Sequence, residues 1–191
     1  MKRNKTQPIA RTIYQQFFPR KMSKSDRRRL EILGSAIQAY GSVGFKHVSY
    51  DDIARVAKTS RRLVSHYFPE KDKLFEVTMK LVRAEYQQAV VDAVMKAKTP
   101  EEKLSNYVTG AIDWAVDHPP HARTWILFYL VSSQRKDFRK THRELATMGE
   151  QRIVAIVSAI KGTALKAKNA RMIAKTIQRL ITGAFIELLT E

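Results

Sequence analysis

The sequence predicts an all-α protein of about eight to nine helices, with a small three-helix domain ahead of a larger helical body. Two observations indicate this fold class. The 44% hydrophobic content can fill a core, whereas 7 Gly and 6 Pro in 191 residues supply few turns for a β-rich fold. Apolar residues also recur at helical spacing along most of the chain. The expected divisions are a basic extension (1–22), the three-helix domain (23–70) and the body (71–191).

The charge balance predicts a polyanionic partner. Lys and Arg number 35 against 18 Asp and Glu, a net charge of +17, and the excess is concentrated in the first 75 residues. The absence of Cys excludes disulfides and thiolate chemistry and suits a reducing compartment. Because no apolar run approaches the ~18–20 residues of a membrane span and no signal-peptide core is present, a cytoplasmic location is expected.

The first 22 residues form a basic amino-terminal extension. Ile9, Ile13 and Phe17 recur at the spacing of one helical face, and Pro19 would end such a helix. Both a mobile tail and a docked helix are compatible with this pattern.

Capping residues predict the three helices of the small domain. Ser23 with Asp26, and Ser49 with Asp52, match the capping-box pattern at a helix start. The first helix presents an apolar stripe and is expected to close at glycines; these residues are Leu30, Leu33, Ile37 and Tyr40, then Gly41 and Gly44. A third short helix is expected from near Ser60 to just before Pro69.

Longer helices are expected in the body, separated by prolines and polar segments. Thr99 is a cap with Pro100 in the first turn, and the break at His118 precedes two prolines. The expected helices cover residues 71–98, 100–117, 124–132, 143–161 and 169–189, with a polar separator at 134–140.

The segment from Gly44 to Phe75 has the spacing of a helix-turn-helix motif. A capped helix is followed by a Lys58-Thr59 turn and a second short helix, with Val64 and Phe68 as apolar residues beneath it. The side chains expected on the opposite face can bond guanine or phosphate from the major groove; they are Ser60, Arg61, Arg62, Ser65 and His66.

These residues resemble the TetR family of bacterial transcriptional regulators. The matching elements occur in order and without a gap over residues 27–75: Gly44-Phe45, Ser49, Asp52-Ile53-Ala54, Ser60 and His66-Tyr67-Phe68-Pro69-Glu70-Lys71. The resemblance implies a homodimer with a three-helix DNA-binding head, a long fourth helix, and a ligand-sensing, dimerising body.

The resemblance also implies the DNA contacts. Ser49, Tyr67 and Lys71 would contact phosphates, and Arg61, Arg62 and Ser65 would meet base edges or backbone. The full expected set is Ser49, Tyr50, Arg61, Arg62, Ser65, His66, Tyr67 and Lys71, with Arg27 and Arg28 ahead of it. The alternative is that these arginines only solvate a helix start or an exposed face.

Three departures from the family pattern prevent any transfer of an operator sequence. Lys58-Thr59 replaces the commoner Gly-Val, Arg62 replaces a small residue, and Ser65 replaces Tyr. Asp51 would repel phosphate, although it can accept a hydrogen bond from cytosine.

An effector pocket is expected near Pro119 and Pro120, from the aromatic residues Tyr107, Trp114, Trp125, Phe128 and Tyr129. The alternative is that these residues belong to the core. Few acids lie nearby, which favours an apolar or aromatic effector. The last two helices are expected to form a dimeric four-helix bundle through Ile153, Ile156, Ile160, Ile177, Ile181 and Phe185.

Catalysis has little support in the sequence. Asp117, His118 and His121 lack the regular helical face of a metal site, and no phosphate loop or nucleophile motif occurs, so neither metal nor cofactor is expected. The leading hypothesis is therefore a ligand-responsive repressor that binds a pseudo-palindromic operator as a homodimer. The alternatives are a nucleoid-type protein that coats DNA without an effector and, with less support, an enzyme built on the body.

Overall fold

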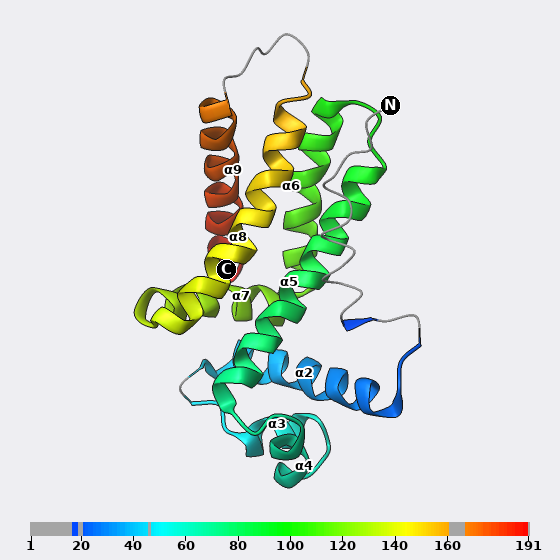
Figure 1. Cartoon of the computed structure of the whole chain (residues 1–191), viewed down its shortest axis with the longest axis vertical. Coiled ribbons are helices and arrows are strands. Elements are labelled where there is room, and N and C mark those ends of the chain that lie inside the picture. The colour runs from blue at the N-terminus through cyan, green and yellow to red at the C-terminus, as the bar shows by residue number, and fades with distance from the viewer. Residues whose placement is uncertain (1–16, 19–20, 46, 161–166, 191) are drawn as a thin grey trace.

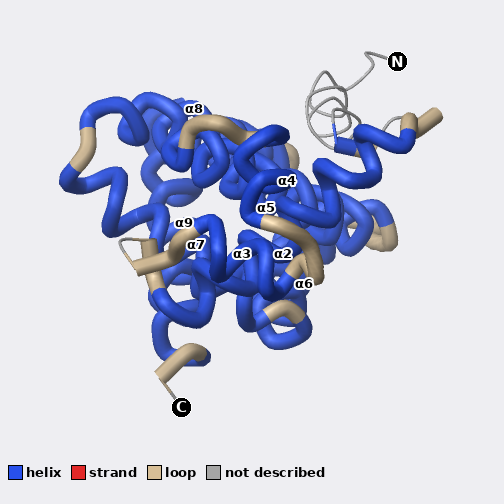
Figure 2. The backbone as a smooth tube through the Cα atoms, turned by 90° about the horizontal axis from the view of Figure 1, so that it is seen from below, coloured by secondary structure: helices blue, strands red, loops and turns tan. Residues whose placement is uncertain are grey.

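The structure is a computed structural model that describes residues 17–18, 21–45, 47–160 and 167–190. These residues contain eight helices and no strand, which confirms the all-α prediction (Figure 2). The helices are α2 (Lys24–Val43), α3 (Tyr50–Val56), α4 (Arg61–Tyr67), α5 (Lys71–Met95), α6 (Pro100–Asp117), α7 (Pro119–Gln134), α8 (Lys136–Val157) and α9 (Ala167–Leu188). Most of the predicted basic extension, at 1–16 and 19–20, lies outside the described residues.

The helices form a small head and a longer body (Figure 1). Helices α2, α3 and α4 make the head, and α5 runs from the head through the body, where it packs along α6. Helix α8 packs along α9, and α7 lies at the junction, where it packs against α2. The body therefore contacts the head through α7 as well as through the continuous chain at α5.

The head helices begin where their caps predict. Both Ser23 and Ser49 accept a hydrogen bond from the backbone three residues later, and the Asp side chain there accepts one from the cap backbone. Helix α2 ends at Gly44, whose φ of 84° lies in the region that favours glycine. Gly41 does not close the helix as expected. It lies inside α2, where a Cβ would come within 2.7 Å of the Pro120 carbonyl oxygen.

Aromatic side chains fill the junction of head and body. Phe75, which is fully buried, packs against Tyr40, Phe45, Phe128 and Phe138, with ring centroids 4.5 to 5.8 Å away. These rings come from α2, the loop after it, α5, α7 and α8. A displacement of α7 or α8 would therefore press directly on the residues that support the head.

Two boundaries in the body differ from those expected. Helix α7 begins at Pro119 rather than Thr124, because proline is tolerated in a first turn that lacks N–H partners. The predicted separator at 134–140 is largely helical, because α8 begins at Lys136. Only Arg135 breaks the helix, and its guanidinium forms two hydrogen bonds with Asp72, at 3.0 and 2.7 Å. None of the described helices is long and apolar enough to cross a membrane.

Candidate DNA-binding surface and ligand cavity

The turn between α3 and α4 is tight. Ala57 caps α3, and the backbone N–H of Thr59 donates to the Ala54 carbonyl at 2.9 Å. Lys58 has a φ of 48°, in the left-handed region that glycine adopts most easily. The departure from Gly noted in the sequence therefore falls on a strained position.

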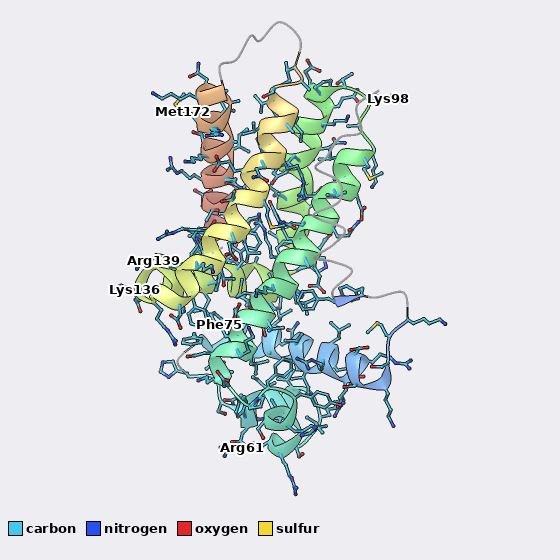
Figure 3. The ribbon with its side chains drawn as sticks, viewed as in Figure 1. Arg61, Phe75, Lys98, Lys136, Arg139 and Met172 are labelled. Atoms are coloured by element: carbon cyan, nitrogen blue, oxygen red, sulfur yellow. The ribbon has the colours of Figure 1, made fainter. Side chains whose placement is uncertain are left out.

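Helix α4 buries one face and exposes the other. Val64 is fully buried and Phe68 is 2% exposed, so both hold the helix against the head. Arg61, Arg62 and His66 are exposed on the other side. Figure 3 shows Arg61 at the end of the head, with its side chain directed away from the body.

The two arginines of α4 differ in their partners. Arg61 lies 3.6 Å from Asp51 on α3, and both side chains are more than 60% exposed. Among the described residues Arg62 forms no ion pair, whereas its carbonyl accepts a hydrogen bond from the Ser65 hydroxyl at 3.1 Å. Asp51 therefore neutralises part of the surface around Arg61 and leaves Arg62 unpaired.

Two of the expected DNA contacts, Ser49 and Tyr50, have hydrogen bonds within the subunit. The Ser49 hydroxyl donates to Asp52 at 2.6 Å, and that bond lowers the pKa of the Asp52 carboxyl to about 2, together with the Ser49 backbone and the Arg55 guanidinium. The Tyr50 hydroxyl donates to the Phe68 carbonyl at 2.7 Å and holds α3 against the end of α4. Both residues therefore have structural roles in the free protein.

The remaining expected contacts lie on the head surface. Tyr67 is half-buried with its ring edge toward His66, and the Lys71 ammonium lies 5.7 Å from the centre of the Phe45 ring. Arg27 is exposed, whereas Arg28 forms an ion pair with Glu31 at 2.6 Å. Arg29, the next residue of this basic run, lies 5.1 Å from the centre of the Phe68 ring.

Three of the five expected pocket residues line one cavity. Trp125, Phe128 and Tyr129 of α7 surround a cavity of about 20 Å³, together with residues of α5 and α8. Tyr107 and Trp114 are buried in the core, where the Trp114 ring meets the Tyr86 ring edge to face. For these two residues the structure matches the alternative given above, that the aromatic residues belong to the core.

The cavity contains two basic side chains that the sequence argument missed. Arg83 of α5 is 5% exposed, donates to the Leu145 carbonyl at 2.8 Å, and lies 4.7 Å from the centre of the Trp125 ring. Burial and the nearby Arg83 charge hold the pKa of His142 below its ordinary value. The sequence does contain a signal for Arg83: it lies four residues after Met79, on the apolar face of α5, where a charged residue is unusual.

The residues expected at a dimer interface are mostly inside the subunit. Ile153, Ile156, Ile181 and Phe185 are at most 7% exposed, and Ile160 and Ile177 are partly buried. These positions differ from the expectation because α8 and α9 pack on α5, α6 and α7 through the same apolar stripes. The large apolar side chains that α9 exposes are Met172, Leu180, Ile186 and Leu188.

The histidines near Pro119 have other partners. Nδ1 of His118 lies 2.9 Å from the Trp114 carbonyl, and Nε2 of His121 lies 3.2 Å from the Glu85 carboxylate. Within the described ranges, no group of three or more His, Cys, Asp or Glu side chains has a metal-binding arrangement.

A capped helix-turn-helix head with an exposed basic second helix, joined to a helical body, defines a helix-turn-helix transcriptional regulator. Residues 32–78 match the family described as bacterial regulatory proteins, tetR family. Residues 32–78 therefore form a DNA-binding domain of the TetR family.

The relatives and solved structures agree with this assignment. The HTH-type transcriptional regulator BetI of Pseudomonas aeruginosa PAO1 is 27% identical over 161 residues, which cover 83% of this chain and 80% of that protein. A transcriptional regulator from Rhodococcus sp. RHA1 has the same fold, with a TM-score of 0.74, 14% identity, and coverage of 85% and 84% of the two chains. A putative transcriptional regulator from Saccharomonospora viridis, in complex with choline, matches with a TM-score of 0.72, 19% identity and 86% coverage of both chains.

Proposed function

We propose that this protein is a ligand-responsive repressor that binds a pseudo-palindromic operator as a homodimer. Residues 23–70 read the DNA, and residues 71–191 bind the effector and the second subunit. The observation that carries the proposal is the outward face of α4, where Arg61, Arg62 and His66 are exposed while Val64 and Phe68 are buried. We propose a cytoplasmic location, because a DNA-binding role requires access to the chromosome.

Helix α7 supports a ligand response, because it contacts both the cavity and the head. Its Trp125 and Phe128 line the cavity. The Thr124 hydroxyl, one residue away on the same helix, lies 3.1 Å from the Ile37 carbonyl of α2. A ligand that moved α7 would therefore shift the head as well as tilt α5. A coupling free energy of ~1–3 kcal/mol is sufficient for such a switch.

Dimerisation is proposed through the exposed face of α9, where Leu180 is 68% exposed and Met172 is 62% exposed. Two copies would pair α8 and α9 as a four-helix bundle and set the separation of the two heads. Leu180→Glu should yield monomers in sedimentation analysis and weaken binding to a two-half-site operator more than binding to a single half-site. A Leu180→Glu protein that remained dimeric would exclude this face.

Selection of bound duplexes from a random pool tests the operator proposal. A regulator recovers an inverted repeat, and random competitor DNA at fixed salt leaves its binding intact, because specific binding exceeds non-specific binding by about 10³ or more. The alternative, a nucleoid-type protein, recovers no repeat and loses its complex to the competitor.

Three alanine variants separate base contacts from phosphate contacts. Arg62→Ala should cost about 1–3 kcal/mol at one base position, whereas Lys71→Ala should weaken all sequences evenly. Lys98→Ala is the matched control, because it removes the same charge at the end of the molecule far from α4 (Figure 3). Even losses from Arg62→Ala across all sequences would exclude its base-reading role.

A further inference from the structure

The body buries positive charge without a compensating carboxylate. Arg83 is 5% exposed and Arg152 is 9% exposed, and no Asp or Glu is buried among the described residues. Neither guanidinium forms an ion pair within that part of the chain. Burial even lowers the pKa of Arg152. Buried charges in folded proteins are normally paired, so this arrangement leaves positive charge available for a ligand.

Three residues that line the cavity at α7 each carry a buried, unpartnered ring or guanidinium nitrogen. These nitrogens are Nε of Arg83, Nε1 of Trp125 and Nε2 of His142, and no group in the described part of the chain accepts a hydrogen bond from them. All three residues line the same cavity, and they come from α5, α7 and α8. Arg and Trp nitrogens only donate, and neutral His donates from one nitrogen. A matching occupant must therefore accept hydrogen bonds.

The cavity shares three lining residues with a larger groove. Its 20 Å³ hold only a small chemical group, but Tyr129, His142 and Ala146 also line a groove of about 720 Å³ between α8 and α9. The charged side chains that line this groove are Arg143, Lys175 and Arg179 against one acid, Glu150. A ligand with a small anionic head and an organic remainder fits both spaces.

Gly149 of α8 provides the room for this polar arrangement. A Cβ at this position would lie 2.6 Å from Nη2 of Arg83 and 2.5 Å from Nε2 of Gln178. Glycine is unfavourable inside a helix, and here its missing side chain lets the guanidinium approach α8 closely. The position of Arg83 is thus built into the packing of α5 on α8.

We propose that the cavity binds the carboxylate of a small organic acid, with Arg83 as its principal partner and Trp125 and His142 as further donors. The proposal rests on the ligand-responsive function proposed above and names the chemical class of the effector. It differs from what the choline complex of the Saccharomonospora viridis regulator would suggest, because choline is a cation and no carboxylate lines this cavity. The organic remainder of the acid lies in the groove between α8 and α9.

Tryptophan fluorescence provides a direct assay. The chain has 2 Trp, so Trp114→Phe leaves Trp125 as the reporter in the full-length protein. Benzoate and hexanoate are titrated against their uncharged amides, benzamide and hexanamide, and against choline. We expect both acids to change Trp125 emission saturably and to raise the Tm. We expect the amides to bind about 10- to 100-fold more weakly, because they lose one charged hydrogen bond. We expect no saturable binding of choline.

Substitutions then identify the binding group. Arg83→Met should abolish the response to the acids while leaving the Tm of the free protein unchanged or higher, because it removes an unpaired buried charge. Arg83→Lys replaces this test if the Met variant does not fold. It keeps the charge but loses the Nε donor, so it should weaken binding by an intermediate factor. Arg123→Gln is the matched control, because it removes an exposed charge of α7 from a residue that lines neither the cavity nor the groove, and it should change affinity less than about threefold.

The proposal is overturned if choline or the amides bind as tightly as the acids, if neither acid binds, or if Arg83→Met and Arg123→Gln have equal effects. These outcomes leave the operator selection untouched, so they are distinguishable from failure of DNA binding. If the acids bind but do not change operator affinity, the anion site stands and the ligand-responsive function fails.

Discussion

Replacement of Gly41 by alanine tests the close packing of the head on the body. A Cβ on Gly41 would lie 2.7 Å from the Pro120 carbonyl oxygen and 3.1 Å from its Cα. Both are backbone atoms of the first turn of α7, so no side chain can rotate away. Ordinary contact begins near 3.4 Å, so α2 and α7 would have to separate by about 0.7 Å.

The magnitude follows from two opposing effects. Alanine is more favourable than glycine inside a helix by about 1 kcal/mol, whereas overpacking costs about 1–3 kcal/mol. Gly41→Ala should therefore leave the free energy of unfolding unchanged or lower it by up to about 2 kcal/mol. Gly34→Ala is the matched control in the same helix, because a Cβ there meets nothing within 4 Å, and it should stabilise by about 1 kcal/mol.

Urea denaturation of both variants, followed by circular dichroism, measures the difference. We expect Gly34→Ala to be more stable than Gly41→Ala by about 1–3 kcal/mol. Operator affinity should also change for Gly41→Ala and not for Gly34→Ala, because only the former moves the head relative to α7. Equal stabilisation by the two substitutions would refute the close approach of α2 and α7.

Three further predictions concern the head. Lys58→Gly should raise the free energy of unfolding by about 0.5–1 kcal/mol in urea, because it relieves a left-handed residue at the cost of chain entropy; no gain would mean that the turn is unstrained. Thr124→Val should cost about 0.5–1.5 kcal/mol in the same assay by removing the hydroxyl that lies 2.8 Å from the Pro120 carbonyl and 3.1 Å from the Ile37 carbonyl, and a neutral result would mean that this hydroxyl carries no net stability. The Ser49 hydrogen bonds lower the pKa of Asp52 to about 2, so its contribution to stability is complete above its unfolded pKa and is lost as the pH falls toward 2. Asp52→Asn should therefore flatten the acid limb of a Tm against pH profile, and an unchanged limb would contradict this role.

Local signals predicted where most helices begin. Ser23, Ser49 and Thr99 cap their helices by bonds to residues three positions away, so the pattern is complete within one turn of sequence. The same locality explains the turn before α4 and the burial of Val64 and Phe68. The start of α8 was missed because Arg135 is held by Asp72, 63 residues earlier in the chain.

The candidate cavity was only partly predictable, because periodicity shows which residues are apolar and not which neighbours they meet. Trp125 and Tyr129 line the cavity, whereas Trp114 from the same expected cluster packs in the core. The stripe containing Ile153 and Ile181 was expected at a dimer interface, and both residues are buried within the subunit. A helical stripe has the same appearance whether it packs on its own subunit or on a second copy.

The sequence by itself determined the helical class, the helix-turn-helix motif and the outward basic face of α4, because caps, turns and apolar spacing act over a few residues. The tertiary structure decided the contact of α7 with the head, the distribution of apolar stripes and the convergence of Arg83, Trp125 and His142 on one cavity. These features depend on the packing of helices far apart in the chain. In particular, the unpaired state of a buried charge depends on what surrounds it in space.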